Sequence, residues 1–509
     1  MLLPADVVFV GLLVGVTALG FLGSRWRKGD LNQLDEWGLA GRRFGTFVTW
    51  FLLGGDLYTA YTFIAVPALV FGVGALGFFA VPYTIVVYPL VFILMPRLWS
   101  VAKKHGQVTL ADFALDRYGS RTLALVIALS GILATMPYIA LQLVGIQVVI
   151  QELGVRGTGA AAHWPLTIAF GAVAAYTYAG GLRAPALTAF AKDILIYVTV
   201  IVAVVYIPFK LGGFAAIFAV AGQALAHRPV PGALILAPKD FTAYATLALG
   251  SALALFMYPH SITGVLSSSG RAVIRRNAAL LPAYSLLLGL IALLGYMAIA
   301  AGIKPINPNY AILDLFVKMF PAWFVGVCFA AIAVGALVPA AVMSIAAANL
   351  CARNIYRQYL RPRCSARQES DVARISSLLI KAGALGFVIW LPTAYAIDLQ
   401  LLAGGWVLQT LPAIVVGLYG RWLHRWALLI GWAVGMLAST AMAVSQGFKP
   451  VYPLHVGGWV VPGYAAFYAL LANLAVTAAL SAVFNAANIP SGDDRTSASD
   501  YTEALGPSR

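Results

Sequence analysis

Residues 50–67 read WFLLGGDLYTAYTFIAVP, and they place two glycines and a carboxylate inside a run that is otherwise apolar and aromatic. Each glycine weakens a helix by about 1 kcal/mol relative to alanine, so Gly54 and Gly55 together favour local unwinding. Asp56 follows at once, although a carboxylate at the centre of a bilayer costs about 2.5–3.5 kcal/mol on insertion scales. If the chain crosses a membrane, this stretch predicts a broken helix that carries a functional carboxylate.

The composition indicates that the chain is a membrane protein. Of its 509 residues, 61% are hydrophobic and 10% are charged, and the mean hydropathy is +0.87. Soluble domains contain about 45–50% apolar and 25% charged residues, so this chain has too little polar surface to cover a water-soluble globule. We therefore predict an all-α integral membrane protein.

Apolar runs of about 20 residues, the length that spans a bilayer core, recur along the whole chain. We predict thirteen spans, at residues 5–24, 45–72, 76–96, 122–150, 164–180, 190–210, 242–265, 279–302, 322–350, 375–396, 399–420, 425–446 and 459–485. The first span follows MLLPAD, which has no positive charge, and it precedes Arg25, Arg27 and Lys28. Because a secretory signal has the opposite order of charge, we expect an uncleaved helix whose N-terminus lies outside.

The formal net charge of +15 is explained by this topology. With the N-terminus outside, most Lys and Arg residues fall in segments that face the cytoplasm, as the positive-inside rule requires. The pattern predicts a C-terminus inside, a multi-pass location in a bacterial inner membrane, and no nucleic-acid partner. Residues 487–509 are polar and poor in large apolar side chains, which predicts a disordered cytoplasmic tail.

Unwound backbone at bilayer depth is tolerated only where protein or a water-filled cavity surrounds it, and its free carbonyls can bind a cation. We therefore expect Gly55 and Asp56 to bind a coupling ion or to carry a proton. The alternative is a close-packed glycine pair in which Asp56 caps a kink. Tyr58, Thr59 and Thr62 follow within two turns and can hydrogen-bond a small polar solute, although such side chains also bond neighbouring helices.

A second broken helix is predicted in the span 242–265, with Gly250-Ser251 in its interior and Pro259 near its inner end. Broken helices at corresponding positions of two halves indicate a transporter built from inverted repeats. We therefore assign residues 1–486 to one transporter domain. Its first repeat is 45–210, its inverted second repeat is 242–420, and its flanking helices are 5–24, 425–446 and 459–485.

Further polar residues lie in the predicted membrane helices. His260 titrates near neutral pH when unperturbed, so it either carries a proton or is an ordinary interfacial histidine. Gln142, Tyr258 and Trp406 are candidates for the lining of a substrate cavity, and each is equally suited to hydrogen-bond a neighbouring helix. The string GVGALG at 72–77 matches a dinucleotide-binding motif, but it follows a predicted membrane helix rather than a strand, which favours a turn between helices. The sequence has no metal-ligand spacing and no other catalytic motif, so neither a cofactor, a metal nor an enzyme is expected.

Four motifs resemble the sodium:solute symporter family. They are TLADFALDRYGSR at 109–121, YTYAGGLRAPALTAFAKD at 176–193, YPH at 258–260 and NLCARNIYR at 349–357. Within that family, the first broken helix and the YPH region look most like the bacterial monocarboxylate permeases. The resemblance covers residues 5–485 and implies a leucine-transporter-type fold with alternating access. It also implies uptake of small monocarboxylates such as lactate and pyruvate, with alanine as a possible addition.

The family's sodium site is only partly present in this sequence. Carried over by the resemblance, its carbonyl ligands fall at Gly55 and Tyr58 on the first broken helix and at Gly335. Its hydroxyl pair falls on Val338 and Pro339, whose side chains offer no oxygen. Pro339 also bends a helix locally, so carbonyls freed there are a substitute source of ligands.

The missing hydroxyls favour a proton over sodium as the coupling ion, with Asp56 as the first candidate carrier and His260 as the second. A desolvated Asp takes up a proton more readily, and symport of an anion with a proton is nearly electroneutral. Two alternatives stay open at this stage. One is a sodium-coupled symporter for an amino acid such as proline or alanine, and the other is a sensor or scaffold that moves no solute.

Overall fold

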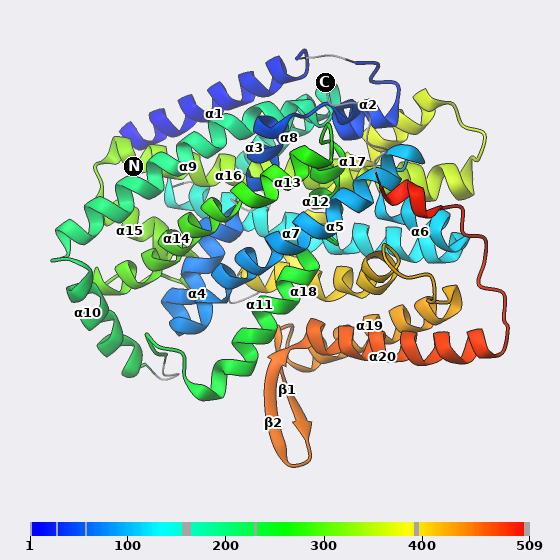
Figure 1. Ribbon diagram of the computed structural model, residues 1–509. Helices are drawn as coiled ribbons and strands as arrows, with labels where there is room; N and C mark the ends of the chain where they lie inside the picture. The colour runs from blue at the N-terminus through cyan, green and yellow to red at the C-terminus, as the bar shows by residue number, and fades with distance from the viewer. Residues whose placement is uncertain are drawn as a thin grey trace.

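The computed structural model describes residues 3–26, 29–55, 59–154, 164–228, 232–390 and 396–502, and this part of the chain is mostly helical (Figure 1). Its longer helices are α1 (Leu3–Gly23), α5 (Ala80–Lys104), α7 (Arg121–Glu152), α8 (Trp164–Gly180), α9 (Arg183–Lys210), α14 (Pro282–Ala300), α16 (Ala322–Leu350), α17 (Ala366–Trp390), α19 (Arg425–Ser445) and α20 (Ala465–Ala486). Its shorter helices include α2 (Leu34–Leu39), α3 (Thr46–Gly55), α4 (Val66–Val73), α6 (Leu110–Tyr118), α10 (Phe214–Ala226), α11 (Phe241–Leu255), α12 (Pro259–Leu266), α13 (Arg271–Leu280), α15 (Ala311–Met319) and α18 (Ile397–Val407).

Within the described residues, nine helices are long and apolar enough to cross a membrane, and the bent pair α11–α12 is a tenth candidate. Every one of the thirteen predicted spans overlaps a helix, but several of these helices are short or broken. The first broken span, for example, consists of α3, a π-helical turn (Tyr61–Ala65) and α4, and neither part is long enough alone. The total of thirteen and the side that each terminus faces stay predictions.

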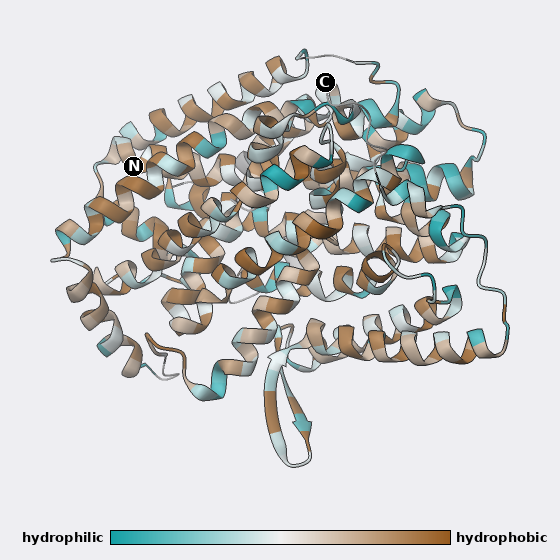
Figure 2. Cartoon of the chain, viewed as in Figure 1, coloured by the Kyte–Doolittle hydropathy of each residue, from teal (hydrophilic) through white to brown (hydrophobic). Residues whose placement is uncertain are grey.

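Helix α16 lies at the centre of the bundle. It packs against α1, α7, α9 and α17, and 94% of its most apolar 18-residue window is buried, whereas only 22% of the window in α1 is buried. The sequence AVGALVPAAVMSIAAAN explains this position, because small side chains let neighbouring helices approach closely. Hydrophobic residues cover the long sides of the helices, and hydrophilic ones gather at the end of the bundle that carries α6 (Figure 2).

Both predicted helix breaks are present, and the second lies at Pro259 rather than at Gly250-Ser251. Helix α11 runs through Gly250-Ser251, and the break falls before Pro259, with a bend of 49° between α11 and α12. Tyr258 is extended there (φ −65°, ψ 137°), because a residue that precedes proline avoids the α region. Gly250 instead permits close packing, since a Cβ there would lie 2.6 Å from the Tyr464 ring.

The predicted span 459–485 is wrong in its first turn. Strands β1 (Val451–Val456) and β2 (Trp459–Tyr464) form an antiparallel hairpin, and α20 begins only at residue 465 (Figure 1). Gly457 and Gly458 form the two-residue turn with φ of 53° and 87°, the conformation that such tight hairpins require. Valine and aromatic residues favour strands. The length of the apolar run, which was the basis of the prediction, does not distinguish a strand from the first turn of a helix.

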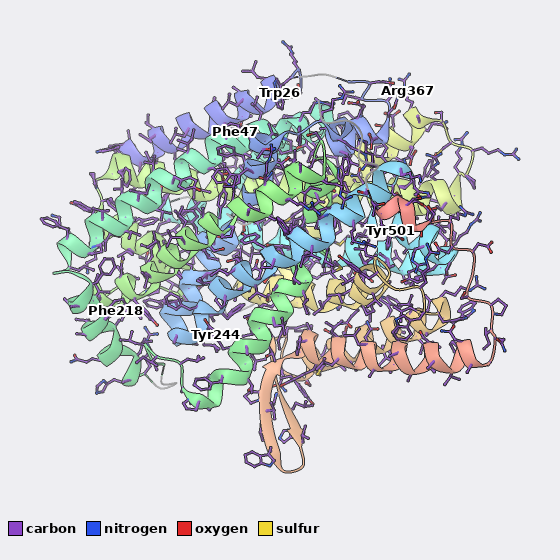
Figure 3. All side chains as sticks on the ribbon, viewed as in Figure 1. Trp26, Phe47, Phe218, Tyr244, Arg367 and Tyr501 are labelled. Carbon is purple, nitrogen blue, oxygen red and sulfur yellow. The ribbon has the colours of Figure 1, made fainter. Side chains whose placement is uncertain are left out.

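The tail predicted to be disordered is instead packed against the bundle as far as residue 502, near the labelled Tyr501 (Figure 3). The amide of Arg495 donates to the carbonyl of Asp116 at 2.8 Å, and Tyr501 is only 4% exposed. Asp494 forms an ion pair with Arg117 of α6. Composition predicts disorder because the tail has little apolar surface, but its acids complement basic residues at this end of the bundle.

Asp500 anchors the same segment through charged hydrogen bonds. Lys104 Nζ donates to it at 2.5 Å, and His105 Nε2 lies 2.8 Å from its second oxygen. Burial opposes ionisation of this carboxylate, but hydrogen bonds from Lys104, Ser497 and His105 outweigh burial and hold the pKa of Asp500 well below its usual range. The tail is therefore fixed by an ionised carboxylate.

Candidate ion-coupling and substrate site

The second half of the first broken helix begins with a set of hydrogen bonds that replace the missing helical ones. Helix α3 ends at Gly55, and the Thr59 hydroxyl accepts from the amide of Tyr61 at 3.0 Å. Gln142 of α7 reaches across, and its Oε1 accepts from the amide of Ala60 at 3.1 Å. Both acceptors satisfy amides that a continuous helix would have paired. The predicted residues Thr59 and Gln142 thus meet at the break.

Asp56 and Tyr58, which the sequence places at the centre of the site, lie outside the described residues. Their roles as proton carrier, ion ligand and substrate ligand stay predictions. Thr62 is within the π-helical turn and only 1% exposed, so it lies on the buried side of the broken helix.

A buried ion pair on α9 faces the same break, and the sequence reasoning missed it. Lys192 and Asp193 are 0% and 1% exposed in their side chains, with Lys192 Nζ 2.9 Å from Asp193 Oδ1. Lys192 Nζ also donates to the carbonyl of Gly55 at 2.5 Å. The hydroxyl of Tyr284 on α14 donates to Asp193 Oδ2 at 2.8 Å. An ionisable residue inside a membrane helix is a functional candidate by default, and that signal in AKD at 191–193 was available.

The glycine pair lets these groups approach. A Cβ on Gly55 would lie 2.8 Å from Lys192 Nζ, and a Cβ on Gly54 would lie 2.2 Å from the ring of Tyr284. Any larger residue at either position would push the ammonium or the ring away. The two glycines therefore end α3 and also make room for the buried charges.

On the α16 side, the predicted positions Val338 and Pro339 leave the helix unbroken. Val338 lies in a small apolar cluster with Ala189 of α9, against which Phe51 of α3 packs. Ala189 is one turn before Lys192 and Phe51 is one turn before Gly55, so α3, α9 and α16 meet at neighbouring turns. No hydroxyl is contributed by Val338 or Pro339 at this meeting point.

Pro339 has a second effect on the same helix. A helical amide bonds the carbonyl four residues earlier, and proline has no amide hydrogen. The carbonyl that loses its regular partner is therefore that of Gly335, the position predicted as an ion ligand. Position 335 therefore loses its regular helical partner, while Val338 and Pro339 offer no hydroxyl.

Tyr258 and His260 lie together at the second break. His260 is fully buried at the start of α12, and its ring centroid is 5.3 Å from those of Tyr138 and Tyr258. The Tyr258 hydroxyl donates to the carbonyl of Gln400 on α18 at 2.9 Å. His260 therefore packs inside the protein, on α12 and against Tyr138 of α7, and its role as a proton carrier stays a prediction.

The polar atom of Trp406 forms its hydrogen bond away from both breaks. Its indole N–H donates to the hydroxyl of Thr440 on α19 at 3.1 Å. The indole therefore links α18 to α19, which is the helix-bonding alternative. A substrate contact of Trp406 stays a prediction.

A small cavity lies beside the second break. Hydroxyl-bearing residues line it from three directions: Thr109 before α6, Thr263 on α12 and Thr410 after α18. Thr109 also donates to Asn354 at 2.8 Å, and Asn354 donates to Asp112 at 2.6 Å. These contacts join two of the motifs that carry the family resemblance and close one side of the cavity.

Two broken helices whose ends lie among buried hydroxyls and a buried ion pair are typical of secondary transporters. A model of the sodium:solute symporter family matches residues 37–435, and the chain belongs to that family. It is thus a multi-pass transporter of the bacterial inner membrane and not an enzyme.

Relatives of this chain are known from several bacteria. A "Monocarboxylate transport permease protein" of Rhizobium johnstonii is 55% identical over 483 residues, which cover 95% of this chain and 97% of that protein. The "Uncharacterized symporter YodF" of Bacillus subtilis is 34% identical, with 95% and 94% covered. A "Sodium/proline symporter" of Escherichia coli is 22% identical, with 75% and 76% covered.

A solved structure of a Na+-coupled sialic acid symporter, in a substrate-bound outward-open state, has the same fold. Its TM-score is 0.75 at 16% sequence identity, and the match covers 96% of this chain and 98% of that one. Similarity at this level of identity concerns the fold alone.

Proposed function

We propose that this chain is a symporter that imports small monocarboxylates, such as lactate and pyruvate, together with protons. The observation that carries the choice of substrate is the 55% identity to a monocarboxylate transport permease across nearly the whole of both chains. Alanine is a further substrate of this proposal. The architecture that goes with it has thirteen spans, two inverted five-helix repeats, an external N-terminus and an internal C-terminus.

The proposed choice of proton over sodium is supported by the site on α16. Sodium is a hard cation that takes oxygen ligands, and the side chains of Val338 and Pro339 supply none. Asp56 and His260 are the proposed proton carriers. Co-transport of one proton with one carboxylate moves no net charge, so the membrane potential would neither drive nor oppose uptake.

The carboxylate is proposed to bind between the two breaks. Candidate donors are the hydroxyls of Thr59, Thr62 and Tyr258 and the amide of Gln142, which are all buried. Helix ends at such breaks also present unpaired amides to anions. Tyr58 and Trp406 belong to the same proposed set.

The test is lactate uptake into proteoliposomes of the purified protein. One set receives an inward proton gradient without sodium, and the other an inward sodium gradient at matched pH. One pH unit is worth about tenfold accumulation at one proton per lactate. Accumulation driven by sodium alone would refute the proton proposal, and Asp56→Asn is expected to abolish accumulation in the proton-driven set.

A second candidate is a sodium-coupled amino-acid symporter, because sodium/proline symporters are also relatives of this chain. They share only 24% and 22% identity with it, compared with 55% for the monocarboxylate permease. Competition experiments separate the two. Excess proline or alanine that blocks uptake more strongly than pyruvate would favour the second candidate.

A further inference from the structure

Helix α17 carries a lysine at the depth of the bilayer core. Lys381 is the only charged residue in 375–390, and it lies about 10 Å beyond Arg374 along the helix axis. Two residues later, a Cβ on Gly383 would lie 3.2 Å from the sulfur of Met136, which is near the middle of α7. Lys381 is therefore level with the middle of the bundle and not with its ends.

The ammonium of Lys381 has no protein partner in the part of the chain that the structure describes. The residue is 4% exposed, and its Nζ is buried and forms no hydrogen bond with a described residue. A buried ammonium requires an anion and hydrogen-bond acceptors, because its charge is otherwise taken out of water without compensation. Lys192 has such a partner, since Asp193 lies 2.9 Å from its Nζ. Lys381 therefore suits an anion that comes from outside the chain.

The acidic residues on the neighbouring helices are either absent or in use. Helices α8 and α16 contain no acidic residue, and Glu152, the one acid of α7, is the last residue of that helix. Glu369 and Asp371 lie near the beginning of α17. Glu369 forms an ion pair with Arg353, and Asp371 lies 3.8 Å from Arg374. The charge of Lys381 is thus matched by no carboxylate from these elements.

Lys381 lines a groove between α8 and α17, and both of these helices pack against α7. The apolar walls of the groove are Leu143, Phe170, Leu378 and Leu385. Small residues leave room between these walls, and a Cβ on Gly171 would have no atom within 4 Å. The groove therefore combines one buried cation with a long apolar surface.

The groove opens on the side of the bundle that faces lipid. Leu378 in its wall is 40% exposed, and the nearby Leu379 and Ile168 are 66% and 62% exposed. Exposed leucine and isoleucine side chains at this depth of a membrane protein contact acyl chains. The walls belong to α7, α8 and α17 and to neither broken helix, so a ligand reaches the groove from the bilayer.

We propose that this groove binds a fatty acid from the bilayer, with its carboxylate on Lys381 Nζ and its acyl chain along the apolar walls. A carboxylate neutralises the ammonium and accepts its N–H bonds, which gives a charge-assisted pair. The inference concerns a second site, so it does not depend on the transport proposed above.

Depth and chemistry select a fatty acid over two other anions. The phosphate of a phospholipid stays at the membrane surface, about 15 Å from the middle of a core that is about 30 Å thick. Lactate is polar and does not dissolve in the bilayer onto which the groove opens. Its hydroxyl would also find few partners, because Thr167 is the one uncharged polar side chain in the walls.

The experiment is photolabelling of the purified protein in phosphatidylcholine vesicles. The probe is a palmitate analogue with a photoreactive diazirine in the middle of its chain. After irradiation and proteolysis, mass spectrometry measures the label on peptides of α8 and α17 at increasing probe concentration. The competitors are palmitate, methyl palmitate, phosphatidylglycerol and lactate.

Three variants are compared with wild type. Lys381→Met keeps the length of the side chain and removes its charge. Gly171→Phe keeps Lys381 and fills the groove, and the open space around its Cβ lets the fold accept the ring. The control is Lys318→Met, which removes a lysine of α15 whose Nζ donates to the carbonyl of Ala301 outside the groove.

We expect saturable labelling of α8 and α17 in wild type and in Lys318→Met, and only palmitate should compete for it. Lys381→Met should require at least about a hundredfold more probe for half-saturation, because it removes one partner of a buried ion pair. Gly171→Phe should lose the saturable label although its ammonium remains.

Several results would overturn the proposal. Absence of saturable labelling in wild type, or equal half-saturation in wild type and Lys381→Met, would refute it. Competition by methyl palmitate as strong as that by palmitate would show that Lys381 does not recognise the carboxylate. Equally strong competition by phosphatidylglycerol or lactate would assign the groove to a phospholipid or to the transported solute. If Lys381→Met does not fold, Gly171→Phe and methyl palmitate decide.

Discussion

Replacement of Gln142 by leucine tests whether the break in the first helix must be held open by α7. Gln142 Oε1 accepts from the amide of Ala60 at 3.1 Å, and Ala60 is 1% exposed. Leucine has nearly the same volume as glutamine, so the change removes the hydrogen bond without leaving a large cavity. A buried amide that loses its partner costs about 1–3 kcal/mol.

This cost falls on the conformation in which the helix is broken at Ala60. If substrate binds that conformation, the apparent dissociation constant of lactate should rise by about 5- to 150-fold, the equivalent of 1–3 kcal/mol. The measurement is equilibrium binding of lactate to purified protein in detergent, followed by the KM of uptake in proteoliposomes. Gln142→Glu keeps an acceptor oxygen, so it should recover most of the affinity.

The control is Gln147→Leu on the same helix. Gln147 is half-buried within α7, and its side chain forms no hydrogen bond with another described residue, so loss of that side chain should leave affinity unchanged. Equal affinity of wild type and Gln142→Leu would refute the reasoning, since the break would then not depend on this bond. An equal loss in both variants would also refute it, because the effect would belong to α7 in general.

Two further predictions follow from close contacts. Gly54→Ala should lower the melting temperature and reduce uptake, because its Cβ would lie 2.2 Å from the Tyr284 ring and overpacking costs about 1–3 kcal/mol. The control is Gly289→Ala. The atom nearest to its Cβ would be 3.9 Å away, so this variant should be nearly neutral in the same thermal melt. Asp500→Asn should speed tryptic cleavage after Arg495 at neutral pH. Because the pKa of Asp500 is lowered by the docked tail, this carboxylate stabilises docking above about pH 4 and loses that effect as the pH falls further. A steep change in the cleavage of wild type between pH 6 and 8 would therefore contradict the assignment to Asp500.

The first break was predictable because three unusual residues are adjacent in an apolar run. Two glycines and a carboxylate within a membrane span are expected mainly where a helix is broken beside a polar cavity, and α3 does end at Gly55. For the second break the sequence offered both Gly250-Ser251 and Pro259, and it did not choose between them because glycine has two roles in membrane helices. At Gly250 it allows close packing against Tyr464, and only Pro259, whose effect on backbone geometry is fixed, interrupts the helix.

The Lys192–Asp193 pair shows what a sequence alone does not provide. Both residues lie near the predicted boundary of the span 190–210, where charged residues commonly reach the membrane surface. Whether such a residue faces water or the bundle depends on the rotation of its helix, which is set by packing against α1, α3 and α16. Periodicity did not settle that rotation, since the helix is apolar on every side.

The lack of hydroxyls at Val338 and Pro339 and the presence of the Lys192 ammonium at the Gly55 carbonyl are best understood as one change. Val338 and Pro339 alone would leave the Gly55 and Gly335 carbonyls without a cation, and an unsatisfied carbonyl in a membrane costs several kcal/mol. Lys192 beside a complete sodium site would place two cations at one carbonyl. Each feature is tolerable only with the other, so Val338→Ser with Pro339→Thr should not create sodium-stimulated uptake while Lys192 remains. The same two substitutions combined with Lys192→Met should create it, and sodium stimulation in the double variant alone would show that Lys192 and sodium do not compete for the Gly55 carbonyl.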